Sequence, residues 1–268
     1  MNWISPDFCD RVYNLLTTSN IRTLQASLSS CLWEGSAEYH FNKRKSCPLS
    51  VYNTSTYEWE SVIEETLEEL KQNPHARITE VHSIKVIEHS LEEALPFIFY
   101  DDDSSLHFKG NVSKQTCQTV IKLFNTAHCW FSKIVNLRYV STACKHFLQR
   151  HIEKGILKDV ILSIGWPKGD TEWIRDVISQ KQLISFCSGD AIALVFDLKI
   201  VENYIFKSGT RVASTYVSIV NFTPSDFLNL LKKRGLHDNY KNCGVFSFKG
   251  RNMFFDFVGR KFTLMKYE

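Results

Sequence analysis

Helical and strand-like patterns of apolar residues alternate most clearly between residues 144 and 188. A helix with one apolar face comes first, at Phe147, Leu148, His151 and Ile152. Gly155 stands where a left-handed residue closes a helix, and residues 157–162 then read as the strand pattern L-x-x-V-x-L. A second helix near residue 170 and a strand opening at Leu183 repeat this order. Because neither helix can bury its apolar face alone, the stretch predicts a stacked array of βα units.

Similar strand patterns recur along the rest of the chain at irregular spacing. Their aligned apolar positions are Ile84, Leu106, Leu137, Val160, Phe186, Thr215 and Phe246. Consecutive positions lie roughly 20 to 30 residues apart, close to the period of leucine-rich repeats. Helices are expected between the strands, beginning near Ser90, Ser113 and Thr223. Since a βα crossover is right-handed, the strands should form one mainly parallel sheet, in which a strand such as 157–164 is covered on both faces.

The two ends of the chain depart from this repeating pattern. An antiparallel C-terminal cap is predicted by three strand patterns with glycine-containing turns between them, at 245–248, 253–258 and 261–265. Residues 1–40 predict short helices, and residues 41–57 are polar without periodicity, which predicts a linker. Residues 58–268, opening with a helix over 58–72, form the expected repeat domain. The predicted fold class is α/β, an irregular βα array like a divergent leucine-rich-repeat solenoid with a mainly parallel sheet.

Composition and charge narrow the classes of function. The 44% hydrophobic content of this 268-residue chain is sufficient for a sizeable core. Its 32 basic and 29 acidic side chains leave a net charge of +3, so we expect neither a nucleic-acid surface nor a membrane-binding face. Eight cysteines without a C-x-x-C pair, and no signal-peptide pattern at the N-terminus, favour reduced thiols in the cytoplasm or nucleus.

Strong local signatures of catalysis or phosphate binding are absent from the sequence. The best metal candidates are Cys144, His146 and His151, but the i, i+5 spacing places the two imidazoles far apart around a helix. We expect residues 101–103, three consecutive aspartates, to form a solvated loop, and residues 165–169 to form a turn with a buried tryptophan. The sequence therefore predicts no enzyme, no cofactor and no metal site.

Two longer motifs resemble a known family. The pattern I-S-P-D-F-C-D-R-V-Y-N-L-L, followed by I-R-T-L-Q-A-S-L-S-S-C-L-W, resembles an F-box that closes with Trp33. Further along, A-C-K-H-F-L-Q-R-H-I-E-K-G-I-L-K-D-V-I-L-S-I-G-W-P-K and D-V-I-S-Q-K-Q-L are similar to nematode-specific F-box-like proteins with divergent leucine-rich-type repeats. The resemblance implies that a Skp1-type adaptor binds Pro6, Val12, Leu15, Leu16, Ile21, Leu24 and Leu28.

This resemblance implies a protein that recruits substrates for a Skp1-cullin ubiquitin ligase. The F-box-like segment would hold the ligase core, and the repeat array would bind an unknown protein target. Two other classes stay open. One is a repeat-protein binding module with a vestigial F-box and no ligase role, and the other is an enzyme whose site is distributed over distant residues.

Overall fold

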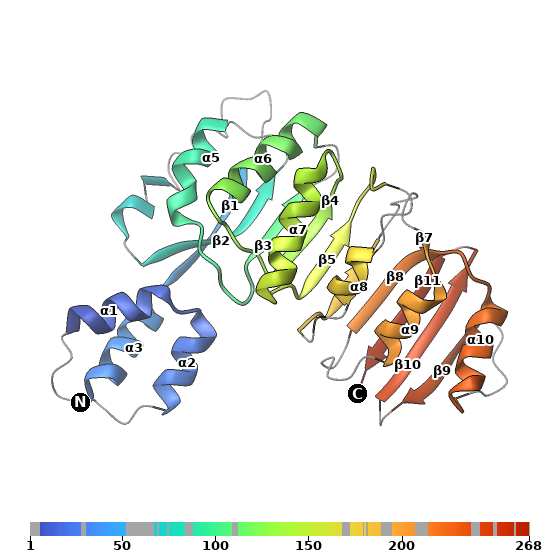
Figure 1. Cartoon of the computed structure of the whole chain (residues 1–268). Coiled ribbons are helices and arrows are strands. Elements are labelled where there is room, and N and C mark those ends of the chain that lie inside the picture. Colours follow the sequence, from blue (N-terminus) through green and yellow to red (C-terminus); the bar gives the residue numbers. More distant parts are fainter. Residues whose placement is uncertain are drawn as a thin grey trace. The chain divides into compact units, whose positions relative to one another are not determined.

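The structure is a computed structural model with two compact units (Figure 1). It describes residues 6–27, 31–51, 67–68, 70–73, 75–83, 88–108, 112–167, 172–178, 180, 182–188, 195–206, 214–236, 242–248, 251–259 and 261–267. Unit 1 comprises Met1–Val112 and Lys122–Ser132. Unit 2 comprises Ser113–Ile121 and Lys133–Glu268.

Unit 1 begins with three helices, as the apolar patches of residues 1–40 predict. They are α1 (Pro6–Leu15), α2 (Thr18–Ser27) and α3 (Cys31–Lys43). Their shared core is formed by the fully buried side chains of Cys9, Tyr13, Ile21 and Ala37. Partly buried side chains pack against this core, namely Leu16, Leu24, Trp33 and Phe41. The Tyr13 hydroxyl donates a hydrogen bond to the Trp33 carbonyl at 2.9 Å, which ties α1 to α3.

The prediction of a linker over residues 41–57 is wrong for the part of this segment that the structure describes. Helix α3 runs to Lys43, and β1 (Lys45–Val51) follows almost at once. Strand β1 pairs in parallel with β2 (Ala76–Ser83), and its register shifts between Cys47 and Pro48. Proline donates no ladder hydrogen bond but is tolerated at such an irregularity. The pairing partner lies far along the chain, so local sequence patterns do not report this strand.

The remaining elements of unit 1 follow the predicted alternation with shifted boundaries. Strand β2 pairs in parallel with β3 (Ser105–Phe108). Between them lie α5 (Glu88–Ala94) and the short 3₁₀ helix η1 (Leu95–Phe97), so Ser90 lies inside a helix instead of capping one. The described part of the helix predicted over 58–72 is helical, with Leu67 and Leu70 buried. Ile84 and residues 58–66 lie outside the described residues.

Helix α6 (Lys114–Thr126) contributes residues to both units. Its N-terminus is capped as predicted, because the backbone N–H of Thr116 donates to Ser113 Oγ at 3.0 Å. Its apolar face buries Cys117, Val120, Ile121 and Phe124. Within unit 1 the ring of Phe124 lies 5.2 Å from that of Phe131.

Unit 2 contains the parallel strands that the sequence predicts. Strands β4 (Lys133–Leu137), β5 (Asp159–Leu162), β6 (Ser185–Cys187) and β8 (Ser214–Val220) pair in that order. The short strand β7 (Val195–Phe196) also pairs in parallel with β8. The helices between these strands are α7 (Thr142–Lys154), α8 (Glu172–Ile178) and α9 (Leu198–Phe206). Figure 1 shows these three helices on one face of the strands.

One face of these strands is more buried than the other, which corrects the expectation that both are covered. In β5, Val160 and Leu162 are fully buried, whereas Asp159 and Ile161 are half-buried. Such alternation is typical of a sheet packed on one side only. The helices lie on one face, and in β5 and β6 the fully buried side chains of Val160, Leu162 and Phe186 alternate with half-buried ones.

The turns on either side of β5 have the predicted local chemistry. Gly155 closes α7 with φ of 69°, a left-handed conformation that glycine adopts at little cost. Trp166 is buried as expected, and its indole N–H donates to the carbonyl of Leu137 at 3.1 Å. Gly165 approaches the backbone so closely that a Cβ would lie 2.7 Å from the carbonyl oxygen of Tyr139. Residues 168 and 169 of this turn lie outside the described residues.

The C-terminal strands are antiparallel, which confirms the predicted change of sheet type. Strand β10 (Arg251–Val258) pairs with both β9 (Cys243–Phe248) and β11 (Lys261–Tyr267), and β11 pairs with β8. Helix α10 (Pro224–Lys233) has a capping box formed by Thr223 and Asp226. Phe227 of α10 packs among the rings of Phe246, Phe255, Phe257 and Phe262. The described chain is therefore an α/β protein with parallel strands followed by antiparallel ones.

Candidate protein-interaction surface

Helix α1 carries two apolar stripes that face in different directions. The inner stripe consists of Cys9 and Tyr13 together with Leu16, which directly follows the helix; it has the spacing i, i+4, i+7 and packs in the three-helix core. The outer stripe consists of Phe8, Val12 and Leu15, which have the same spacing one residue earlier. Phe8 is 52% exposed and Leu15 is 84% exposed. An amphipathic helix needs only one apolar stripe to join a core, so the outer stripe is available to a partner.

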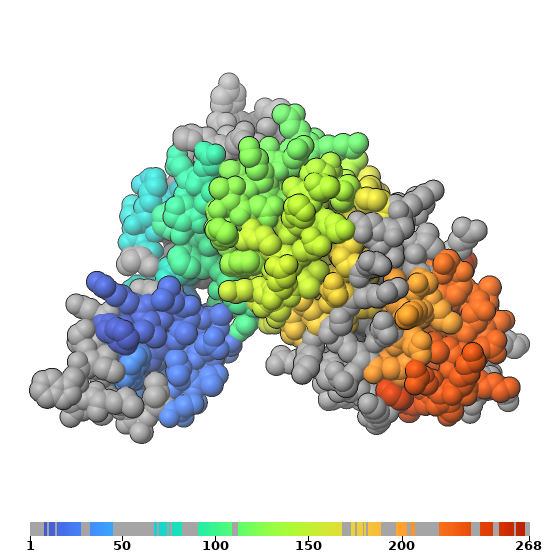
Figure 2. All heavy atoms as spheres, viewed as in Figure 1, coloured from blue at the N-terminus to red at the C-terminus, as the bar shows by residue number. Residues whose placement is uncertain are grey.

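The outer stripe lies partly exposed on the surface of the three-helix segment. Phe8 packs the edge of its ring toward Trp33, with the ring centroids 6.4 Å apart. The Phe8 residue nevertheless remains 52% exposed. On α3, Tyr39 is a further large side chain with 49% exposure. Figure 2 shows described atoms of these helices, in blue, at the surface of the chain.

The seven residues predicted to bind an adaptor do not lie on one surface. Leu15 is exposed and Val12 is half-buried, and both belong to the outer stripe. In contrast, the inner core contains Leu16, Ile21 and Leu24. Pro6 is the first residue of α1, and Leu28 lies outside the described residues.

Phe8 is the exposed apolar residue that the sequence reasoning missed. It lies one helical repeat before Leu15, at i, i+7, and a two-stripe reading of α1 would have found it. Trp33, the expected closing residue of the F-box-like pattern, packs against the core with its ring 5.7 Å from that of Tyr13. The candidate surface is therefore the outer stripe of α1 and not the full predicted set.

The three aspartates before β3, residues 101–103, were predicted to form a solvated loop. Two of them instead form hydrogen bonds with α2. Thr18 Oγ1 donates to Asp101 Oδ2 at 2.6 Å, and the backbone N–H of Thr18 also points to this carboxylate at 3.4 Å. Ser19 Oγ donates to the Asp102 carboxylate. These two carboxylates meet the first turn of α2, where helix N–H groups lack partners and favour negative charge. Asp103 alone of the three is exposed.

Arg44, which lies between α3 and β1, binds the C-terminal end of α1. Its guanidinium donates to the carbonyl oxygens of Leu16 at 2.7 Å and Tyr13 at 2.9 Å, at the C-terminal end of α1. A cation at this end of a helix satisfies carbonyls without partners and complements the helix dipole. Burial lowers the pKa of Arg44, and the nearby Asp101 carboxylate opposes that shift. The helical segment is thus anchored to the strands of unit 1, which corrects its predicted separation at residue 40.

The three residues considered as metal ligands, Cys144, His146 and His151, do not lie around one common point. His151 is buried, and its Nδ1–H donates to the carbonyl of Phe147 at 2.7 Å. Burial lowers the pKa of His151 to about 4. His146 is exposed on another side of α7, and Cys144 Sγ is 3.4 Å from the carbonyl oxygen of Arg138. Among the described residues, no group of three or more potential ligands could hold a metal ion.

Cys117 and Cys144 are two cysteines of unit 2 that approach the same carbonyl group. Both thiols donate to the Arg138 carbonyl oxygen, at 3.6 Å and 3.4 Å. The proximity of the two thiols raises the pKa of Cys117 and lowers that of Cys144 to about 7. Both side chains are fully buried. A buried thiol packs as a small apolar group, so we assign this pair a structural role.

Comparison of the chain with family models, with curated proteins and with solved structures finds no match. Within the described ranges, no helix combines the length and apolar character required to span a bilayer.

Proposed function

We propose that this chain is a protein-interaction adaptor that recruits a target protein to a Skp1-cullin ubiquitin ligase. In this proposal the outer stripe of α1 binds a Skp1-type adaptor, and the βα units bind the target. The observation that carries it is the 84% exposure of Leu15 on a helix whose other stripe already supplies the core. We further propose the cytoplasm or nucleus as its location, because the cysteines whose side chains the structure describes are free thiols.

The free energy available from burying the outer stripe supports a binding role. Burying a leucine or phenylalanine side chain is worth roughly 1.5–3 kcal/mol. In the isolated chain Leu15 gains little of this and Phe8 roughly half, since they are 84% and 52% exposed. A partner that covers both would gain the remainder. Apolar anchors of this kind dominate the affinity of many interfaces.

For the rest of the chain we propose a divergent solenoid like that of leucine-rich-repeat proteins. Support comes from the order of strand and helix in unit 2, and from the helices on one face of β4, β5, β6 and β8 (Figure 1). The opposite parity of β5 is half-buried, so that face of the strand keeps some exposed area. Arrays of this kind bind protein partners over extended surfaces. The target protein is unidentified.

The substitution Leu15→Glu tests the proposed adaptor surface. We expect it to abolish capture of a purified Skp1 homologue by the full chain, because it places an unpaired charge in a desolvated contact. The expected loss is about 2–5 kcal/mol of binding free energy. Since Leu15 is 84% exposed, the melting temperature should stay nearly constant. Ala26→Glu, an exposed position on α2, is the matched control and should bind like the wild type.

The substitution Leu16→Glu tests whether Leu16 serves the fold or the adaptor interface. The sequence predicted that Leu16 faces the adaptor and is dispensable for folding, whereas the structure packs it against the three-helix core. We expect Leu16→Glu to destabilise unit 1 by about 2 kcal/mol, because it removes a partly buried apolar side chain from its contact with the three-helix core. If Leu15→Glu binds as tightly as Ala26→Glu, the outer stripe is not the adaptor surface and the proposal fails.

A specific observation also favours the alternative of a binding module without a ligase role. Leu16, Ile21 and Leu24, expected at the adaptor interface, are used in the core of this chain. Fewer apolar anchors then remain for an adaptor than the resemblance implies. If the folded wild-type chain captures no Skp1 homologue, this alternative replaces the ligase role.

A further inference from the structure

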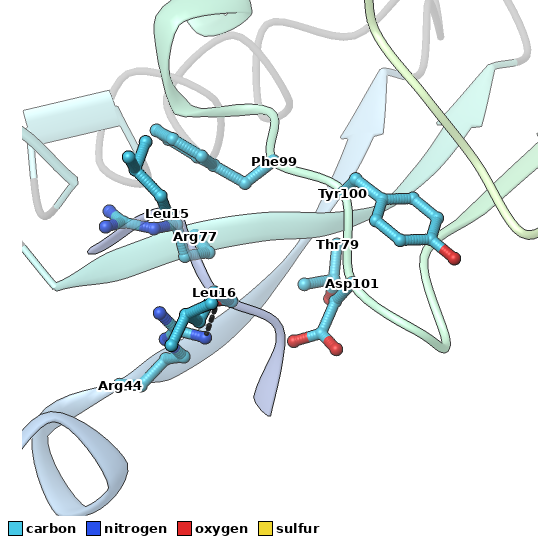
Figure 3. A pocket seen from close by; sticks show the side chains of 8 residues that line it. All are labelled: Leu15, Leu16, Arg44, Arg77, Thr79, Phe99, Tyr100 and Asp101. Atoms are coloured by element: carbon cyan, nitrogen blue, oxygen red, sulfur yellow. Dashed lines mark hydrogen bonds between the residues drawn. The ribbon is translucent and has the colours of Figure 1, made fainter. Parts of the chain in front are cut away.

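Three arginines line a hollow in unit 1 that no part of the proposed function uses. The hollow has a volume of about 200 Å³, and its charged side chains are Arg22, Arg44, Arg77 and Asp101. A smaller adjoining hollow of about 20 Å³ shares Arg44, Arg77 and Asp101 with it, and Leu15 of the outer stripe also lines this smaller hollow. In Figure 3, the two shared guanidinium groups lie on one side of this smaller hollow and the Asp101 carboxylate on the other.

Each arginine is held in place by a different contact. The Arg22 guanidinium lies over the ring of Phe41, 4.8 Å from its centroid, and that of Arg77 lies 4.1 Å from the centroid of Phe99. Arg44 is fixed by the two carbonyl oxygens at the end of α1. A guanidinium that already lies on an aromatic face or a carbonyl loses less conformational freedom when a ligand binds.

The lining of the hollow is strongly positive although the chain as a whole is nearly neutral. Three guanidinium groups face one carboxylate, a local charge of +2 among the lining residues, against +3 for all 268 residues. The Asp101 carboxylate also accepts hydrogen bonds from Thr18 and from the backbone N–H of Asp102. Burial lowers the pKa of Arg77, and the like charge of Arg44 lowers it further. An anion between these cations would relieve their repulsion.

We propose that this hollow binds a phosphate group. A phosphate monoester carries a charge of about −1.5 to −2 near neutral pH, which matches the local +2. Each guanidinium has five N–H donors arranged to bind phosphate oxygens in pairs. Only two of the five donors of Arg44 are committed to the α1 carbonyls.

The size of the hollow is sufficient for a phosphate group. Its volume of about 200 Å³ is several times the roughly 30 Å³ that one water molecule occupies in the liquid, so it admits a phosphate group and part of the residue or molecule that carries it. The two sources of this chemistry are free inorganic phosphate and a phosphorylated serine or threonine side chain.

Calorimetric titration of the full chain with inorganic phosphate tests the site. We expect saturable binding of one phosphate per chain. Arg22 is exposed, so Arg22→Gln should fold normally and weaken binding at least about fivefold, and Arg22→Glu should abolish it. Lys122→Gln and Lys122→Glu make the same charge changes at an exposed position of α6 that lines neither hollow, and should bind like the wild type.

Two outcomes would overturn the proposal. One is the absence of saturable phosphate binding by the folded wild type. The other is an equal loss of affinity in the Lys122 and Arg22 variants, which would show a response to net charge and not a site. Neither outcome bears on capture of a Skp1 homologue, so this inference and the proposed function can fail separately.

A peptide titration distinguishes the two sources of phosphate. A short phosphoserine peptide that binds about tenfold tighter than inorganic phosphate would assign the hollow to a phosphorylated protein segment. Equal or weaker binding of that peptide would assign it to the free anion. The same peptide without its phosphate should not bind, and equal binding of both peptides would contradict a phosphate site.

Discussion

Leu15 and Leu16 are adjacent leucines at the end of α1, yet one is 84% exposed and the other packs in the three-helix core. One step along a helix turns a side chain by about 100°. Neighbours in a run of apolar residues can therefore belong to different faces. The same rotation separates Phe8 from Cys9, which is fully buried. At this scale the identity of a residue tells less about its role than its position on the helix.

The buried His151 leads to a pH prediction at the residue scale. Its folded-state pKa is lowered from 6.5 to about 4, chiefly by burial. The unfolded chain therefore takes up a proton as the pH falls through 6.5, while the folded chain stays neutral at this site until about 4. The contribution of His151 to stability is full above pH 6.5 and is lost progressively as the pH falls from 6.5 to about 4.

We expect this loss to reach about 3 kcal/mol, at roughly 1.4 kcal/mol per pH unit. The measurement is the free energy of unfolding in urea at several pH values, for the wild type and for His151→Leu. The variant should lack this part of the pH dependence. Parallel profiles for the two proteins across the same window would show that His151 titrates normally in the folded state.

Strand β5 shows that the neighbours of a strand decide which of its faces are buried. Its sequence is apolar on both parities at Val160, Ile161 and Leu162, which is typical of a strand covered on two faces. The structure buries Val160 and Leu162 fully and Ile161 only in part. The difference arises because helices cover one face of the strand. The strand itself was predictable, and the covering of its second face was not.

Paired aspartate substitutions test this assignment for β5. We expect Val160→Asp to cost about 3 kcal/mol or more, because the carboxylate would be buried without a partner. Ile161→Asp should cost clearly less, since its half-buried position leaves the carboxylate partly hydrated. Urea midpoints of both variants give the comparison. Equal losses would indicate that both faces of β5 are covered after all.

The distribution of charge becomes informative only for the whole molecule. The net charge of +3 over 268 residues indicates no charged ligand. The arginines of the hollow lie at positions 22, 44 and 77, and Asp101 lies further along the chain. Folding of unit 1 brings them together, so a neutral average conceals a positive site. Conversely, the histidines and cysteines that are close in sequence around α7 face apart.

We expect the folded protein to need no metal ion. The reason is that the sequence contains no C-x-x-C pair and no pair of histidines at the i, i+4 spacing of a zinc site. Dialysis against a chelator should therefore leave the melting temperature unchanged, since a ligand that binds only the folded state would raise it. Elemental analysis of the dialysed protein provides the control. One zinc ion per chain that resists dialysis would contradict this expectation.

The sequence by itself determined the elements whose signals are local. Apolar spacing predicts α7 and its neighbouring strands, Gly155 marks the end of α7, and Ser113 and Thr223 mark helix starts. The change to antiparallel strands near the C-terminus also follows from local turn residues. These features depend on contacts within a few residues, so a pattern in the chain is sufficient to reveal them.

Only the tertiary structure decided the features that depend on distant partners. Strand β1 exists because β2 pairs with it, although residues 45–51 carry no strand pattern. Asp101 and Asp102 lose their solvated character because they meet the start of α2. The division of α1 into an inner and an outer stripe depends on where α2 and α3 pack. Burial and pairing are properties of three-dimensional neighbours, and a single sequence without its fold does not specify which neighbours meet.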